Sequence, residues 1–414
     1  MAGRHPRLVA QGRARMTLAA RQAGGVDISP LWLQGAYRLL FAAGALWAVV
    51  VVTLWIGALG GRWTLPTAMD PLAWHQHEML FGYLSAIIAG FLSAAIPNWT
   101  GRPTVTGWRV AALVGLWLAA RLAILFSAAV PPLAGAALDV GFLLLLLVYA
   151  AREIFASGNR NKPILVVLFL FATACALDHA AAMGAIADPA LGMRMGFALV
   201  LILISLIGGR IIPAFTRNWL LQQKRGEGLP VMPNRFDMAV IAATALALAA
   251  WAAAPTSSLA GGLLLLAGAL QLVRLARWAG LKARRSPLVF ILHISYAWLP
   301  VGLLLLGWAI LHPAFPPSSA MHALGAGAMA AMTLAVMTRA TRGHTGRPLE
   351  ADQATVAIYI LVHLGALLRV TAPFLPFDYM GAIALAGGLW GAAFLLFLIV
   401  YGPMALQPAP KVRV

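Results

Sequence analysis

Long apolar runs alternate with short polar connections along almost the whole chain. Each run has about the 20 residues that a helix needs to cross the ~30 Å hydrocarbon core of a bilayer. We therefore expect an all-α integral membrane fold with about twelve transmembrane helices. The pattern places them over residues 36–60, 77–97, 107–129, 132–152, 162–185, 190–214, 236–254, 259–279, 287–311, 319–340, 353–372 and 380–403.

Composition agrees with the pattern and excludes a water-soluble protein. Of the 414 residues, 62% are hydrophobic and only 10% are charged, which is not the balance of a soluble globular domain. The longest connection, near residues 215–235, is too short to form a soluble domain of its own. The sequence predicts a basic tail over residues 1–35, a single transmembrane domain over residues 36–404 and a short tail over residues 405–414.

The net charge of +18 follows the connections between helices and does not indicate a nucleic-acid-binding surface. Basic residues recur after every second predicted helix, and few fall on the opposite side. Because membrane proteins concentrate Lys and Arg on the cytoplasmic side, we expect both termini to be cytoplasmic. The expected partner of this charge is the lipid bilayer, and no nucleic acid is expected. The residues predicted on the outer side are Arg62, Arg121, Arg194 and Arg369.

Short sequences recur at a nearly constant offset. The tetrapeptide TGRP follows the second predicted helix at residues 100–103 and the tenth at residues 345–348. The stretch IPAFTRNW at residues 212–219, after the sixth helix, resembles IPNWT at residues 96–100. Either these are chance matches between Ala- and Leu-rich segments, or the second, sixth and tenth helices each begin a unit of four helices.

Histidines gather near the predicted outer ends of several helices. The densest group is WHQHE at residues 74–78, where His75 and His77 begin the second helix. His322 begins the tenth helix, whereas His179 and His363 lie inside the fifth and eleventh. A histidine at a helix end is often only interfacial, but one among lipid tails is costly and indicates a bound metal or haem.

Helix geometry limits what the His75 and His77 pair can do. Two residues on a helix are about 200° apart, so the two rings point to opposite sides. They would bind one metal only if the chain were extended there. Otherwise they serve two centres, or one ligates while the other forms a hydrogen bond. Glu78, three residues after His75, lies on the same helix face and is expected to orient that imidazole.

Two arginines lie unusually deep in the predicted membrane. Arg121 and Arg369 are roughly 21–24 Å from the inner edge at helical rise. Each either extends to the outer headgroups or pairs with a buried anion. A haem with outward propionates would supply such carboxylates, and Asp178, beside His179, is the alternative partner.

The histidine group also carries a family resemblance. WHQHEMLFG at residues 74–82 resembles the W-H-x-H-E-M-x-F-G signature of the NnrS family, and residues 209–218, GRIIPAFTRN, continue the likeness. The resemblance implies a bacterial cytoplasmic (inner) membrane protein that contains haem and copper and is linked to denitrification and to protection against nitric oxide. Since the sequence has one cysteine and no C-x-x-C-H motif, we expect a non-covalently held haem b.

The catalytic subunits of haem–copper oxidases are the nearest mechanistic comparison. They also have twelve spans in three groups of four, with histidines on the second and tenth. This chain lacks the His-Pro-Glu of their sixth span, and its predicted seventh helix, residues 236–254, has no histidine. The three-histidine copper site of that family is therefore missing, and whether the chain is an enzyme stays open.

Three functions follow from these observations. The first is a haem- and copper-binding protein that binds or processes nitric oxide or another diatomic gas, with an electron donor that the sequence does not identify. The second is a twelve-span secondary transporter, and the third is a haem sensor or assembly factor without turnover. The candidate haem residues are His75, His77, His363, His322, Arg121 and Arg369; those for copper or haem iron are His75, His77, His179 and His322, supported by Glu78 and Asp178.

Overall fold

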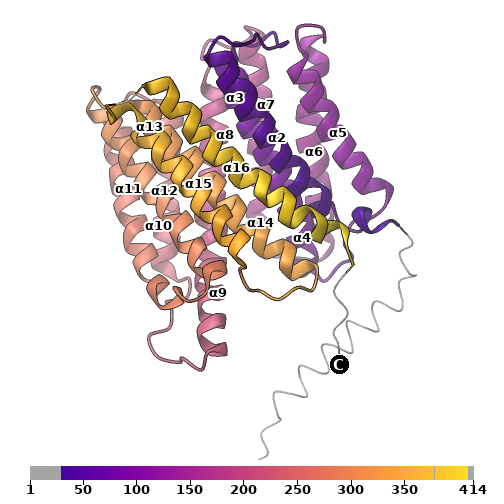
Figure 1. The fold of residues 1–414 in the computed structure, drawn as a ribbon, viewed down its shortest axis with the longest axis vertical. Coiled ribbons are helices and arrows are strands. Elements are labelled where there is room, and N and C mark those ends of the chain that lie inside the picture. The colour runs from indigo at the N-terminus through magenta and orange to yellow at the C-terminus, as the bar shows by residue number, and fades with distance from the viewer. Residues whose placement is uncertain (1–28, 377, 409–414) are drawn as a thin grey trace, which may run out of the picture.

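The computed structural model describes residues 29–376 and 378–408, and every regular element within them is helical (Figure 1). Twelve of these segments are long and apolar enough to cross a membrane, which confirms the expected all-α membrane fold. Most of the two predicted tails, residues 1–28 and 409–414, lies outside the described residues. The cytoplasmic position of the termini stays a prediction.

The spans follow one another with short connections. In chain order they are α2 (Ala36–Leu59), α3 with α4 (Pro71–Thr100), α5 (Trp108–Leu125), α6 (Pro132–Ala156), α7 (Pro163–Ala182), α8 with α9 (Leu191–Gln222), α10 (Arg235–Ala253), α11 (Ser258–Ala276), α12 (Pro287–Leu311), α13 with α14 (Pro317–His344), α15 (Gln353–Thr371) and α16 (Tyr379–Leu406).

The second span begins six residues earlier than the hydropathy pattern predicted. The Asp70 carboxylate accepts hydrogen bonds from the backbone N–H groups of Leu72, at 2.9 Å, and Ala73, at 3.3 Å. Pro71 occupies the first helical position, where its missing N–H costs no hydrogen bond. The polar WHQHE stretch hid this start, because polar residues lower the hydropathy even where the protein interior buries them.

Three spans contain a π-helical segment. These segments are Glu78–Tyr83 in the second span, Ile204–Gly208 in the sixth and Ala323–Met329 in the tenth. They fall in the same three spans that the repeated sequences singled out, although a grouping into four-helix units stays a prediction. Since π-helical turns are rare and often mark functional sites, they direct attention to the residues beside them, which include His77 and His322.

The second span forms the interior of the bundle. Of its most apolar stretch, 83% is buried inside the protein, against 33% for α6. The first and last spans, α2 and α16, pack side by side although they are far apart in the sequence (Figure 1). The Arg38 guanidinium donates a hydrogen bond to the Ala405 carbonyl across this contact. The ends of the chain thereby close the bundle around the second span.

Candidate functional site

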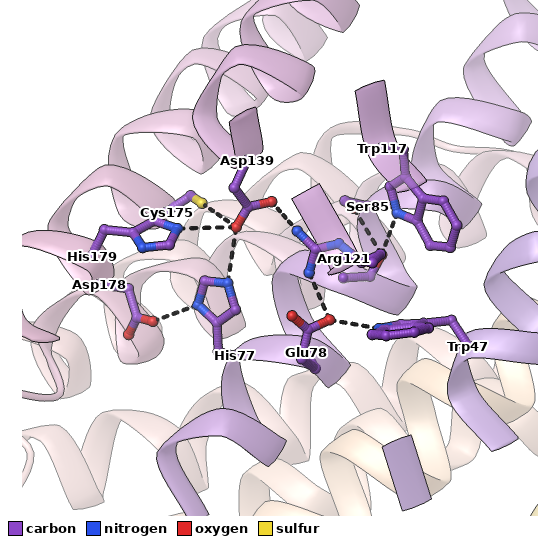
Figure 2. A network of polar contacts seen from close by, with 11 residues as sticks. Trp47, His77, Glu78, Ser85, Trp117, Arg121, Asp139, Cys175, Asp178 and His179 are labelled. Carbon is purple, nitrogen blue, oxygen red and sulfur yellow. Dashed lines mark hydrogen bonds and ion pairs between the residues drawn. The ribbon is translucent and has the colours of Figure 1, made fainter. Parts of the chain in front are cut away.

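A network of buried polar side chains connects one end of the second span to three neighbouring helices (Figure 2). Consecutive spans run in opposite directions, so the first part of the second span meets the end of α5, the start of α6 and the end of α7. Each of these four helix ends contributes at least one ionisable residue. We call the group the His77 cluster; it comprises His77, Glu78, Arg121, Asp139, Cys175, Asp178 and His179.

Both ring nitrogens of His77 face carboxylates. Nε2 lies 2.8 Å from Oδ2 of Asp139, and Nδ1 lies 2.8 Å from Oδ2 of Asp178. His179 directs its Nε2 at the same Asp139 oxygen from 3.1 Å, and the Cys175 thiol approaches that oxygen at 3.4 Å. One carboxylate oxygen is therefore the centre on which two imidazoles and a thiol converge.

Arg121 holds the other side of the cluster. One guanidinium nitrogen donates to Glu78 at 2.6 Å, and another donates to Oδ1 of Asp139. The Trp47 indole also donates to Glu78, at 2.5 Å. The side chains of Arg121, Glu78 and Asp139 are fully buried. Buried charges of this kind persist only when they are paired, so the three form one electrostatic unit.

Gly82 leaves room for this ion pair. A Cβ atom at this position would lie 2.3 Å from a Glu78 oxygen and 2.7 Å from an Arg121 nitrogen. Glu78 begins the π-helical turn that contains Gly82, and its carboxylate bonds to Arg121 of α5. The absence of a side chain at Gly82 therefore allows Glu78 and Arg121 to form their ion pair.

His75 lies in a different environment from His77, as the helical spacing predicted. Its ring stacks on Trp55, with 5.1 Å between centroids and 15° between planes. It is within electrostatic range of His322 and Arg369, which come from the end of α13, near the start of the tenth span, and from the end of α15. Nδ1 of His75 and one guanidinium nitrogen of Arg369 are buried without a hydrogen-bond partner. We call His75, His322 and Arg369 the His75 group.

His363 lies apart from both groups, beside a cavity of about 580 Å³ between α12 and α15. Its Nδ1 lies 2.8 Å from the Tyr359 carbonyl oxygen, so Nδ1–H donates and Nε2 keeps a free lone pair. Nε2 is buried and has no partner. Apart from His363, the lining is apolar, with Trp298 and Leu364 among its residues.

A family model described as NnrS protein matches residues 30–409, nearly the whole chain. The chain belongs to the NnrS family. No curated protein matches it. Membership in the NnrS family indicates a membrane protein related to nitric oxide, and the twelve apolar helices make it a multi-pass one.

Two expectations, one for Glu78 and one for Arg121, were wrong. Glu78 does not orient His75, because its one hydrogen-bonded oxygen accepts from Arg121 and Trp47. Arg121 neither extends to the headgroups nor pairs with Asp178, because Glu78 and Asp139 occupy its guanidinium. Asp178 instead supports His77.

Sequence reasoning missed Asp139 as a member of the site. Its position inside a predicted transmembrane helix could have identified it, since an ionisable residue inside a transmembrane segment is a functional candidate by default. Asp139 lies two turns into α6, on a helix with no histidine, so nothing in the local sequence connects it to His77. Only the packing of α6 beside α7 and beside the second span brings the carboxylate to both imidazoles.

Proposed function

We propose that this protein binds haem b and a second metal, for which the family implies copper, in the bacterial inner membrane, and that it binds or processes nitric oxide in denitrification or nitrosative stress. Family membership supports the connection to nitric oxide. The observation that carries the haem assignment is the buried, unpartnered polar atoms of His75 and Arg369.

The His75 group fits a haem. His322 has its Nδ1 2.7 Å from the Ser318 carbonyl oxygen, so the N–H donates there and leaves the Nε2 lone pair for iron. Arg369 forms no ion pair within the part of the chain that the structure describes; one guanidinium nitrogen is buried without a partner and is available for a propionate, while the side chain also forms a hydrogen bond with Tyr379. His75 and His322 would ligate the iron from the second and tenth spans.

Other candidate residues are less suited to the haem. Arg121 already forms ion pairs with two carboxylates, so its guanidinium is not free to pair with a haem propionate. His77 is held between Asp139 and Asp178. His363 has a free Nε2 and an adjoining apolar cavity, so it is the second candidate for an axial ligand.

Copper fits the His77 cluster only in part. Among the described residues, one group brings three potential metal ligands together: His77, Asp139 and His179, whose ligand atoms all lie within 4.8 Å of one another. Two imidazole nitrogens and a carboxylate oxygen bind Cu(II) well but lack the soft sulfur ligand that favours Cu(I). The set therefore suits a divalent ion better than a copper that cycles between two states.

A haem iron binds a diatomic gas when one axial position is open and transfers electrons when both are filled. The chain's own contribution is to hold the imidazoles, through Trp55 stacking and the Ser318 hydrogen bond.

Replacement of His75 or His322 by alanine is expected to abolish haem binding. Purified wild-type protein should give a Soret absorption band and a positive pyridine-haemochrome assay, and both variants should lose these signals. The matched control is His312→Ala, because His312 is exposed and only stacks on Trp308. Wild-type protein without a Soret band would refute the haem assignment. If His363→Ala is the only variant that loses haem, the haem site is instead at the cavity between α12 and α15.

A titration with nitric oxide then tests the gas site. If one axial position opens, the Soret band should shift as nitric oxide is added to the reduced protein. A spectrum that does not change would assign the haem to electron transfer and contradict gas binding at this iron.

A further inference from the structure

The His77 cluster has the donor set of a mononuclear non-haem iron site. We infer that His77 Nε2, His179 Nε2 and Asp139 Oδ2 hold an iron(II) ion that binds nitric oxide directly, separate from the haem. The inference rests on the proposed function for the identity of the gas, but not for the metal site itself. Two histidines and one carboxylate are the ligand set of non-haem iron(II) centres, which leaves other coordination positions open.

The three ligands converge as such a site requires. They come from α3, α6 and α7, and both rings point at one Asp139 oxygen (Figure 2). All three residues are buried, and their ligand atoms lie within 4.8 Å of one another. An ion between them would replace the hydrogen bonds that now join each imidazole to the carboxylate.

The atoms behind these ligands are also fixed. Nδ1 of His77 donates to Asp178, the carboxylate–histidine arrangement that orients a ligand and increases its basicity. The second oxygen of Asp139 accepts from Arg121, which Glu78 holds in place. Metal ligands in proteins generally have such outer partners, whereas a histidine that is only packed in a core needs none of them.

Charge supports a divalent cation at this position. The cluster contains three carboxylates, those of Glu78, Asp139 and Asp178, but only one guanidinium, that of Arg121. With neutral imidazoles the cluster carries two excess negative charges, a costly state in a membrane interior. One divalent ion would neutralise these two charges. The alternative is a cluster without metal in which both imidazoles, those of His77 and His179, are protonated, since both ring nitrogens of His77 face carboxylates.

The position of the single cysteine leaves the ligand set without sulfur, the donor that favours Cu(I). The Cys175 thiol contacts the Asp139 oxygen at 3.4 Å and is not part of the three-ligand group. The set thus has only nitrogen and oxygen donors, and its open positions suit iron(II). Nitric oxide would add to the iron as a further ligand, and no proton or electron is exchanged in that step.

Metal and haem analysis of the same purified samples tests the inference. After anaerobic loading with ferrous iron and removal of excess, wild-type protein should contain roughly one iron per chain beyond its haem iron. Nitric oxide should then give the quartet-spin resonance of a non-haem iron nitrosyl beside the doublet of a haem nitrosyl. Asp139→Asn and His179→Ala should lose the extra iron and the quartet signal while they keep their haem.

The control variant is His293→Ala, which removes a buried histidine that contacts Thr216 and lies outside the cluster. It should keep the extra iron. The inference would be overturned if the iron content of wild type only equalled its haem content. It would also be overturned if copper or zinc were bound in place of iron and were lost in His179→Ala. Extra iron without any haem would instead overturn the haem assignment and leave this site standing. If Asp139→Asn fails to fold, His179→Ala still decides, because it keeps both ion pairs of Arg121.

Discussion

Arg121→Met is expected to destabilise the folded protein by about 3–5 kcal/mol, the cost of leaving a buried charge without its partner. The substitution keeps roughly the length of the side chain but leaves Glu78 without a cationic partner and Asp139 with only its imidazole contacts. The loss should be measured as unfolding in detergent, by heat or by a graded denaturant. Arg62→Met is the control, since Arg62 is exposed in the connection between α2 and α3.

A second substitution separates charge from packing. Adding Glu78→Gln to Arg121→Met removes the buried carboxylate charge that has lost its only cation, so the double variant should be more stable than Arg121→Met alone. In wild type, Glu78→Gln weakens an existing ion pair and should destabilise. If Glu78→Gln has the same effect in both backgrounds, the electrostatic unit of Arg121, Glu78 and Asp139 does not exist as described.

The hydropathy pattern was enough to predict most of the fold, because a bilayer imposes one requirement on every span. Within the membrane each backbone polar group must be satisfied by a helix or a closed barrel, so twelve apolar runs of sufficient length sufficed to predict twelve helices. The same measure failed at the start of the second span, where buried polar residues resemble an aqueous connection. Helix capping by Asp70 and Pro71 was the better local signal there.

The candidate site was predictable only where the partners are neighbours on one helix. The 200° spacing separated the environments of His75 and His77 correctly. The partners of Arg121 were missed because they come from two other helices: Glu78 lies on the second span and Asp139 on α6. Side-chain pairing between helices depends on packing, which no single-helix pattern contains.

Gly192 fixes the distance between α8 and α7, the helix that carries Asp178 and His179. A Cβ at Gly192 would lie 2.3 Å from the backbone nitrogen of Asp178 and 2.6 Å from the carbonyl oxygen of Ala174. These are backbone atoms of a helix, so no side chain can turn aside. The two helices would have to separate by roughly 1 Å to restore normal contact, in an interior packed as densely as a crystal.

Gly192→Ala is therefore expected to cost about 1–3 kcal/mol of stability, as overpacking of a core does, and to remove most of the metal from the His77 cluster. The second effect follows because ligand positions must hold within about 0.5 Å, and α7 would carry His179 away from Asp139. Haem should stay, since His75 and His322 lie on α3 and α13. Metal analysis, haem assay and thermal unfolding of one sample measure all three. Gly391→Ala is the control, because Gly391 is buried in α16 and a Cβ there meets nothing within 4 Å. Equal metal content in the two variants would show that α7 does not set the geometry of the cluster, whereas loss of haem in Gly192→Ala would mean that the two sites are not separate.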